Sequence, residues 1–483
     1  MRWRREPLQP RELLKFSFLA LLVIFSRLDT VFLMTFFGLY LVFRALPLRH
    51  FLLTDSLGIL FFTFAAFIFR VGMKEYYTYG ETALYFALLL LLLSLPIYYF
   101  VGIYQHPRTF SVTDLLKRIV IGVTLPTALA ATLMLLLQRV GLVGSFPRSA
   151  VLLLWVAQMG WVAATRFFVR FIAAPRERWS SLTPVQLFKE KWQIWLGEGI
   201  RFYGVWGGGL ALYMFFNRLT FGTFSPVSGQ VKRWWGSLSG NVYGGAAKRK
   251  YTFFGLDTVA ESDFNAWGLV SKFILWLRDR LVEWVGYADS DRAYWWLFFA
   301  LLLLIGILLF TSLKRTLRAG VRFGLLPLFV GSVTQVISYH ATGYSAAKEW
   351  YWVTQIIFTL LVLAILLDIF YRALLRIHPV TRYLGYALTA LLVIVWARGF
   401  YAHIAHLMPY GVEHEGHRYM EILAVVEENT EPGSLIGMTG GGNLGYFIED
   451  RTIVNMDGLI NSYEYFLAPK DERGDEYLAA MGL

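Results

Sequence analysis

The chain contains no cysteine and little charge. None of its 483 residues is a cysteine, which excludes disulfide bonds, thiolate metal sites and thiol-based catalysis. Only 16% of the residues are charged, against roughly 25% in soluble domains. The sequence therefore has too few charged side chains to cover the surface of an ordinary water-soluble protein.

Apolar residues are abundant and occur in long blocks. Hydrophobic residues make up 57% of the chain, and residues 301–310, LLLLIGILLF, contain no polar side chain. A helix of about 20 such residues spans the ~30 Å hydrocarbon core of a bilayer. We therefore predict an all-α polytopic membrane protein with about 9–11 membrane segments. Single spans are expected near 51–69, 82–104, 118–137, 149–165, 202–216, 294–312, 321–339, 351–371 and 383–400.

The net charge of +12 fits the same class. Lys and Arg cluster in short loops between apolar runs, which indicates cytoplasmic loops of a membrane protein rather than a nucleic-acid-binding surface. The basic loops 173–200, 313–320 and 372–382 are predicted inside, which places the loop 217–293 and the tail 401–483 outside. We expect a multi-pass inner-membrane protein with a cytoplasmic N-terminus and an extracytoplasmic C-terminus. Its partners would include the lipid bilayer but no nucleic acid.

The N-terminal segment contains two apolar runs, 16–26 and 31–43, separated by Arg27-Leu28-Asp29. Each run is too short to cross a bilayer alone, so the pattern predicts a hairpin of two short helices with its tip in or near the outer half of the membrane. Charged residues at such a tip are expensive unless they are paired or face a wet cavity. Arg27 and Asp29 therefore either pair structurally or bind a lipid phosphate.

Two regions outside the spans have a mixed composition. Residues 217–293 are rich in Gly and aromatic residues and are expected to form loops and short interfacial helices, one of them over 264–286. After the last span, a helix over 419–427 and strands over 434–438 and 452–456 predict a small α/β unit. The expected organisation is a short-helix hairpin (1–46), a four-span domain (47–175), a cytoplasmic loop and span (176–216), an outer loop region (217–293), further spans (294–406) and the extracytoplasmic α/β unit (407–483).

One set of motifs resembles the C-type membrane glycosyltransferases, which use polyprenyl-phosphate sugars. Residues 216–232, FNRLTFGTFSPVSGQVK, are similar to the N…FGT…P-[IV]-S-G…K loop of that family. Residues 26–29, SRLD, resemble its S/T-R-x-D/E break between short helices. His340 followed by residues 349–351, EWY, resembles the entry to a late span, and residues 443–461 resemble the signature of its outer C-terminal domain. The resemblance covers about 1–50 and 180–483.

Residues 47–175 carry a second resemblance, to the four-span membrane domain of capsule-type nucleotide-sugar dehydratases and epimerases. Residues 49–55, RHFLLTD, are similar to the opening of that domain, and Arg166 and Arg170 match its fourth span. The catalytic dinucleotide-binding domain of that family does not follow. Nucleotide-sugar chemistry is therefore not implied.

The first resemblance implies sugar transfer from a polyprenyl-phosphate donor to a glycan or lipid acceptor on the outer face, in envelope polysaccharide assembly. Cationic side chains would neutralise the lipid phosphate. Aromatic side chains would stack on the sugar or lie in the interfacial belt. The candidate lipid-phosphate and sugar-binding residues are Arg27, Asp29, Asn217, Ser228, Lys232, Arg233, His340, Lys348, Trp350, Tyr351, Asp457 and Asn461.

The catalytic residue is unknown. C-type enzymes usually carry an Asp or Glu in the first outer loop as a general base or metal ligand, whereas the first outer loop expected here, 70–81, offers only Glu75 and Glu81. The chain is either an enzyme whose base comes from elsewhere, a fragment, or a non-catalytic scaffold that binds lipid-linked glycans. A transporter is disfavoured because the spans lack midplane acid pairs and broken-helix repeats.

No motif requires a cofactor, and a divalent cation is the one candidate. Asp289 and Asp291 form a D-x-D triplet, and His414 and His417 lie in an acidic, His-rich segment after the last span. A solvated turn for the two aspartates and an interfacial exit helix for the two histidines are the favoured explanations of these residues. Residues 440–445, GGGNLG, fit G-x-G-x-x-G but leave no room for the long crossover helix of a dinucleotide site.

Overall fold

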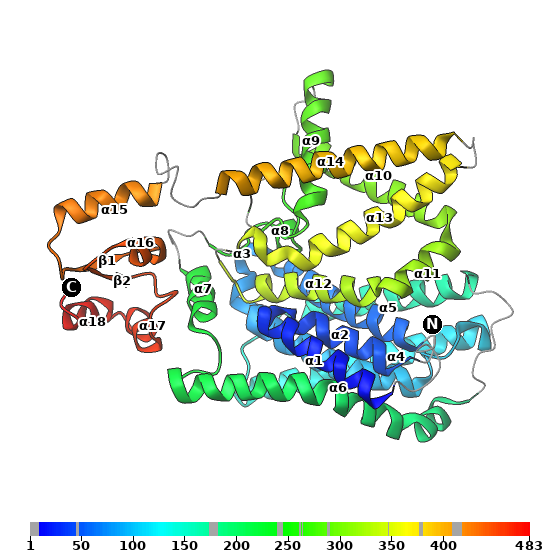
Figure 1. Ribbon diagram of the computed structural model, residues 1–483. Coiled ribbons are helices and arrows are strands. Elements are labelled where there is room, and N and C mark those ends of the chain that lie inside the picture. Colours follow the sequence, from blue (N-terminus) through cyan, green and yellow to red (C-terminus); the bar gives the residue numbers. More distant parts are fainter. Residues whose placement is uncertain are drawn as a thin grey trace. The chain divides into compact units, whose positions relative to one another are not determined.

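The computed structural model describes residues 9–44, 48–172, 182–238, 245–259, 262, 264–286, 290–345, 347–375, 380–407 and 418–483. The chain divides into two compact units. The first comprises Met1–Leu212 with Arg233–Leu363, and the second comprises Tyr213–Lys232 with Ala364–Leu483. Both units are mainly helical (Figure 1).

The first unit contains most of the long helices. Its elements are α1 (Pro10–Ser26), η2 (Leu28–Thr30), α2 (Val31–Val42), α3 (Leu48–Val101), η3 (Pro107–Thr109), α4 (Val112–Arg139), α5 (Arg148–Ile172), the greater part of α6 (Pro184–Phe221), the end of α7 (Val227–Ser237), α8 (Lys250–Phe253), α9 (Gly268–Val285), α10 (Ser290–Thr311), α11 (Leu313–Phe323), α12 (Leu325–Ala341), η4 (Glu349–Trp352) and the start of α13 (Val353–Leu375).

Helix α3 contains two of the predicted spans. Its 54 residues are helical except at Gly72, whose φ of 80° and ψ of 161° lie outside the helical region. The rings of Phe67 and Phe86 lie 6.3 Å apart, whereas 19 residues of straight helix would separate them by about 28 Å. The helix therefore folds back at Gly72 into two arms. Residues 73–81 belong to the second arm, so the expected outer loop 70–81 is wrong.

The core of the first unit lies between the two arms of α3 and helices α4, α5 and α12. Helix α2 lies alongside α12 (Figure 1). The two backbones approach closely at Gly331, where an added Cβ would lie 2.7 Å from the Cα of Leu33. This close approach fixes the end of the N-terminal segment against α12.

The predicted break after the first apolar run is confirmed. Helix α1 ends where Arg27 adopts an extended conformation, with φ −158° and ψ 111°. The hydroxyl of Thr30 donates to the carbonyls of Val23 and Arg27, at 3.0 and 2.8 Å. These bonds satisfy backbone acceptors that the broken helix leaves open.

The expected polytopic helical class is confirmed, with fewer long apolar helices than predicted. Among the described residues, six helices are long and apolar enough to span a bilayer, or seven if the bent pair α11–α12 is one span. The α3 helix counts once although it covers two predicted spans. The predicted span 202–216 lies in α6, which is not among the six; three consecutive glycines, Gly207 to Gly209, and the neighbouring Arg201 lower its hydropathy.

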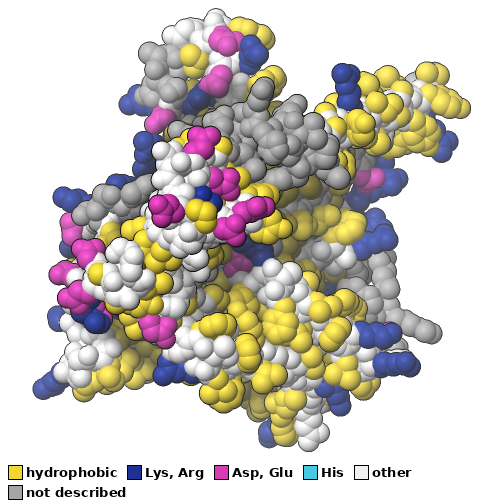
Figure 2. Space-filling view, turned by 60° about the vertical axis from the view of Figure 1, so that its left-hand side comes forward, with side chains coloured by type: hydrophobic (Ala, Val, Ile, Leu, Met, Phe, Trp, Pro, Cys, Tyr) yellow, Lys and Arg dark blue, Asp and Glu magenta, His cyan; other side chains and the backbone are white. Residues whose placement is uncertain are grey.

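Exposed apolar side chains support a bilayer environment. Hydrophobic side chains cover a large part of the face shown in Figure 2. On α10, Trp296, Leu303 and Phe310 each have more than half of their surface exposed. Water-soluble monomers rarely expose apolar surface on this scale, whereas lipid chains accept it.

The bend between α11 and α12 measures 65°. Helix α11 carries Lys314, Arg315, Arg318 and Arg322 within 11 residues. At the centre of a bilayer each of these cations would cost about 2.5–3.5 kcal/mol. The bent pair is therefore better described as the apolar helix α12 preceded by a basic helix at the membrane boundary.

The second unit contains the remaining elements. They are the end of α6, the start of α7, the end of α13, α14 (Thr381–Leu407), α15 (Arg418–Asn429), β1 (Leu435–Met438), α16 (Gly442–Phe447), β2 (Thr452–Asn455), α17 (Tyr463–Lys470) and α18 (Gly474–Ala480). The two strands pair in parallel, with Leu435 opposite Thr452 and Met438 opposite Asn455. They lie where strands were predicted.

The regions of mixed composition are more helical than expected. Between residues 217 and 293, the described part includes the end of α6, helices α7 and α8, and α9, which lies within the helix predicted over 264–286. The segment between the two strands contains only the six-residue α16. The connection is thus as short as the spacing of the two predicted strands implies, with no long crossover helix between them.

Candidate functional site

The break between α1 and α2 presents an ion pair. The Nε of Arg27 donates to Oδ1 of Asp29 at 3.0 Å, and its Nη2 donates to Oδ2 at 2.7 Å. The Nη1 of Arg27 donates to the carbonyl of Trp350, beyond the far end of α12. Burial acts to lower the pKa of Arg27, but the hydrogen bond and negative charge of Asp29 outweigh it and raise this pKa.

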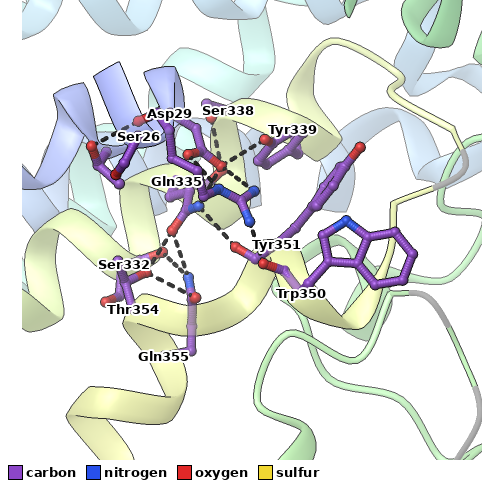
Figure 3. A network of polar contacts seen from close by, with 12 residues as sticks. Ser26, Asp29, Ser332, Gln335, Ser338, Tyr339, Trp350, Tyr351, Thr354 and Gln355 are labelled. Carbon is purple, nitrogen blue, oxygen red and sulfur yellow. Dashed lines mark hydrogen bonds and ion pairs between the residues drawn. The ribbon is translucent and has the colours of Figure 1, made fainter. Parts of the chain in front are cut away.

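Asp29 accepts two further hydrogen bonds from α12. The side-chain amide of Gln335 and the hydroxyl of Tyr339 each donate to Oδ2 of Asp29, both at 2.7 Å (Figure 3). The carboxylate thus receives four donors and is largely buried, with 11% of its side chain exposed. These four hydrogen bonds engage the lone pairs of the carboxylate and fix its orientation.

Gln335 connects this ion pair to the start of α13. Its amide nitrogen also donates to the carbonyl of Tyr351 at 3.1 Å, and its carbonyl oxygen accepts from the hydroxyl of Thr354 at 2.6 Å and the amide of Gln355 at 3.2 Å. The amide of Gln355 in turn donates to the carbonyl of Ser332. Figure 3 shows these groups directed toward one another from the α1–α2 break and, about 306 residues later, from α12 and the start of α13. We call this set the Asp29 network.

The prediction from sequence omitted Gln335, Tyr339, Thr354 and Gln355. A signal was present, because Gln335 and Tyr339 are four residues apart and therefore share one face of a helix that is expected to lie in the membrane. Polar side chains on one face of a membrane helix usually point to a protein interior or a wet cavity. The glycosyltransferase-like motifs instead predicted binding residues in the loops.

Aromatic rings border the Asp29 network on one side. The guanidinium of Arg27 lies over the ring of Tyr351, 4.7 Å from its centroid. The ring of Tyr339 stacks on Tyr351 at 5.6 Å and contacts Tyr344 edge-on at 4.7 Å. Trp350, beside this cluster in Figure 3, is 65% exposed. The cluster is therefore a cation–aromatic surface with one ring open to the surroundings.

The C-terminal end of α7 lies against the same loop. An added Cβ on Gly236 would overlap the carbonyl oxygen of Gly343, at 1.5 Å, so the two backbones are in direct contact. Burial raises the pKa of Tyr344, as do Tyr351 and Asp29, while the positive charge of Arg233 acts to lower it. Arg233 thus contributes to the electrostatics of this loop.

His340 and Lys348 take different positions on the α12–α13 connection. His340 is 1% exposed, its Nδ1 lies 2.8 Å from the carbonyl oxygen of Phe253, and its ring packs near Phe264. These contacts place His340 in the protein interior. Lys348 is half-buried immediately before η4, beside Glu349, which forms an exposed ion pair with Lys272 at 2.9 Å.

In the second unit, the predicted loop and the C-terminal signature lie next to each other. An added Cβ on Gly222 would lie 3.5 Å from the ring of Tyr463, and one on Gly458 would lie 3.6 Å from Val231. The loop itself is held by Gln230, whose amide donates to the hydroxyl of Thr223 at 2.8 Å. Two segments more than 200 residues apart in sequence thus meet.

The predicted residues of the second unit are mostly buried. Asn217, Lys232 and Asp457 are each less than 10% exposed, and Ser228 is half-buried. Asp457 caps the turn after β2, since its carboxylate accepts from the backbone N–H of Gly440 and Leu459 at 2.8 and 2.9 Å. Asn461 donates to the carbonyl of Asn455. Asp457 and Asn461 therefore stabilise the strand–helix turn.

The candidate residues thus form two groups, one in each unit. The first unit holds Arg27, Asp29, Arg233, Lys348, Trp350 and Tyr351 around the Asp29 network, together with the buried His340. The second unit holds Asn217, Ser228, Lys232, Asp457 and Asn461. The division falls between the neighbouring residues Lys232 and Arg233 of α7.

The metal candidates gain no support. Asp289, His414 and His417 lie outside the described residues, and Asp291 lies in the first turn of α10. Across the described ranges, no group of three or more His, Asp or Glu side chains could hold a metal ion. Of the two carboxylates in the former loop 70–81, Glu81 accepts from the hydroxyl of Tyr85 at 2.9 Å, one turn along α3.

The chain was compared with models of protein families, with characterised proteins and with solved structures, and none of them matches it. The fold and the site define a polytopic helical membrane protein with a polar network between three chain segments.

Proposed function

We propose that this protein is a C-type glycosyltransferase-like enzyme that transfers a sugar from a polyprenyl-phosphate donor to a glycan or lipid acceptor. The convergence in the Asp29 network carries the proposal. The break after α1, the polar face of α12 and the loop before α13 supply one partly exposed cation and an adjoining aromatic surface. These are the groups that a lipid phosphate and a sugar ring require.

Arg27 is the proposed phosphate ligand. The guanidinium of Arg27 donates to Asp29 and to the carbonyl of Trp350 and lies close to Tyr339, and 26% of the side chain is exposed. The exposed part of this side chain can donate to a phosphate oxygen, and Lys348 supplies a second positive charge. The exposed Trp350 offers a ring face for the sugar. In the proposed reaction the acceptor hydroxyl oxygen forms a bond to the anomeric carbon as the bond between that carbon and the lipid phosphate oxygen breaks. The hydroxyl proton passes to water or to the departing phosphate, whose charge these cations neutralise.

The general base remains unassigned. Asp29 is not the base in this proposal because four donors already occupy its carboxylate. Its proposed role is to orient Arg27. Any divalent cation would be an additional requirement, since no described cluster supplies its ligands.

The proposed location of the reaction is the outer face of the inner membrane, with the N-terminus inside and the C-terminal α/β elements outside. The placement of basic loops supports this orientation. A chain without native cysteine allows a direct test. Single cysteines at Glu349 and Tyr446, both strongly exposed, should react with an impermeant maleimide in intact cells, and one at Arg372 only after lysis. The reverse pattern would overturn the orientation.

The activity is tested with membranes supplied with radiolabelled polyprenyl-phosphate sugar. Arg27→Ala and Lys348→Ala should each lower sugar transfer by at least tenfold, the effect of losing one charge-assisted contact of about 1.4 kcal/mol or more. Arg280→Ala, which removes an exposed arginine paired with Glu283, is the matched control and should leave transfer unchanged. Transfer at the parental rate in both variants would remove the site assignment.

The alternative is a non-catalytic protein that binds lipid-linked glycans. The occupied Asp29 carboxylate favours it, because no described carboxylate of the network is left to act as a base. Titration of the purified protein with a polyprenyl-phosphate sugar separates the two. Saturable binding without turnover, lost in Arg27→Ala, would establish the scaffold.

A further inference from the structure

Helix α11 is a short basic helix whose polar and apolar residues are separated around its circumference. Lys314, Arg318 and Arg322 recur every fourth residue. At 100° per residue they occupy an arc of about 80°. Leu313, Leu317 and Val321 follow the same spacing on the adjoining face. The helix contains no acidic residue, so its charge is of one sign.

Both faces are open within the described structure. Lys314, Arg318 and Arg322 are exposed, and half of the surface of Leu317 and of Phe323 is exposed as well. Helix α11 packs against its chain neighbours, α10 and α12 (Figure 1). An exposed apolar stripe beside an exposed cationic stripe is the arrangement of helices that lie in the membrane interface.

The bend that sets the direction of α11 is built into the chain. Gly324 ends the helix with φ of 63°, a conformation that side-chain-bearing residues rarely adopt. An added Cβ at this position would lie 2.8 Å from the ring of Phe37 on α2. The 65° turn between α11 and α12 is therefore held by local geometry and by packing against α2.

We infer that α11 is an anionic-lipid-binding helix that lies in the membrane interface. Its apolar stripe contacts the acyl chains at the boundary, and Lys314, Arg318 and Arg322 bind the phosphates of anionic phospholipid headgroups. The charged groups of an anionic lipid surface are phosphates, and the three exposed cations on one arc of α11 complement them. Charge complementarity therefore selects this partner. This surface is independent of the Asp29 network and of the proposed sugar transfer.

The test uses the full-length chain with one introduced cysteine, Leu317→Cys, labelled with bimane and reconstituted in nanodiscs. Nitroxides on the acyl chains of phosphatidylglycerol or phosphatidylcholine serve as quenchers. The labelled chain should be quenched by both lipids, with phosphatidylglycerol preferred by about fivefold or more, the effect expected of one cation near an anionic surface. Raising the salt concentration should reduce this preference, because exposed charges are screened.

In the same labelled background, K314Q/R318Q/R322Q should bring the preference close to one. The matched control R280Q/K470Q/R473Q removes the same charge from exposed positions elsewhere and should keep it. Weak quenching by acyl-chain nitroxides in the labelled parent would show that the apolar stripe does not lie on lipid. Equal quenching by the two lipids, or a preference that salt and K314Q/R318Q/R322Q leave unchanged, would show that the cations do not select the headgroup. Any of these results overturns the inference.

Discussion

Two of the arginine–carboxylate pairs in the first unit differ in what surrounds them. Arg166 on α5 and Asp55 on α3 form a bidentate pair with bonds of 2.6 and 2.5 Å, and neither side chain is exposed. The ring of Phe51 covers the guanidinium at 4.2 Å. In the Arg27–Asp29 pair, 26% of the arginine side chain is exposed.

The difference separates a structural pair from a candidate binding pair. The Asp55–Arg166 pair joins α3 to α5 through two residues that are 111 positions apart in sequence, and aromatic rings cover its donors. The Arg27–Asp29 pair joins two residues that are close in sequence, and part of the arginine side chain is exposed. A buried charge pair is costly to break, whereas a partly open pair can exchange a protein contact for water or for a ligand.

The largest effect is expected where the pair is closed. Asp55→Asn leaves the charge of Arg166 buried without its counter-ion, which should lower the free energy of unfolding by about 3–5 kcal/mol. SDS-induced unfolding in mixed micelles, followed by circular dichroism, measures this loss.

The double variant Asp55→Leu, Arg166→Met is the control for this prediction. It removes both charges and should recover most of the lost stability, because apolar groups of similar volume replace the pair. An Asp55→Asn protein as stable as its parent would show that Arg166 is not held by Asp55 alone, and the contrast between the two pairs would fail.

A smaller effect is expected at the open pair. Asp29→Asn exchanges a charged acceptor for a neutral one beside three donor side chains, which should cost roughly 1–2 kcal/mol. The side chain of Arg27 is partly exposed, so the surroundings can solvate its charge. The loss of stability should therefore be clearly smaller than for Asp55→Asn.

The comparison becomes sharper when ligand binding is measured on the same proteins. Asp29→Asn should weaken binding of a polyprenyl-phosphate sugar because it releases the orientation of Arg27, whereas Asp55→Asn should leave the affinity of the folded fraction unchanged. Affinities measured by quenching of tryptophan fluorescence distinguish the two. An equal loss in both variants would mean that general destabilisation, rather than the position of Arg27, sets the affinity.

Sequence reasoning predicted the features that depend on local composition. The apolar runs, the break at Arg27, the helix near 264–286 and the two short strands follow from hydropathy, charge and periodicity within a few residues. The loop 70–81 was wrong because a run of helix-forming residues on both sides of Gly72 continues the helix, and only the glycine breaks it. Helix α6 shows the same limit of prediction from local composition. Three glycines lower its hydropathy although the helix is continuous.

The sequence did not predict which side chains pair with each other across the fold. Asp55 and Arg166 both stood in segments of the dehydratase-like resemblance, yet nothing in either segment predicted that they pair. Gln335 was overlooked although it connects Asp29 to Thr354 and Tyr351. Such contacts depend on how α3, α5, α12 and α13 pack, and packing is decided by the sum of many apolar contacts rather than by a motif.

The smallest effect is expected at a third ion pair, between Lys272 on α9 and Glu349 at the start of η4. Both side chains are more than half exposed, so water and salt screen their attraction. Lys272→Gln should change the free energy of unfolding by less than about 0.5 kcal/mol, within the scatter of the same SDS titration. Because Glu349 precedes Trp350 directly, the variant also tests whether the loop needs this anchor for ligand affinity. An unchanged affinity would mean that the Asp29 network, rather than this ion pair, keeps the site rigid. A loss of stability comparable to that of Asp29→Asn would contradict the idea that burial ranks the three ion pairs by their contribution to stability.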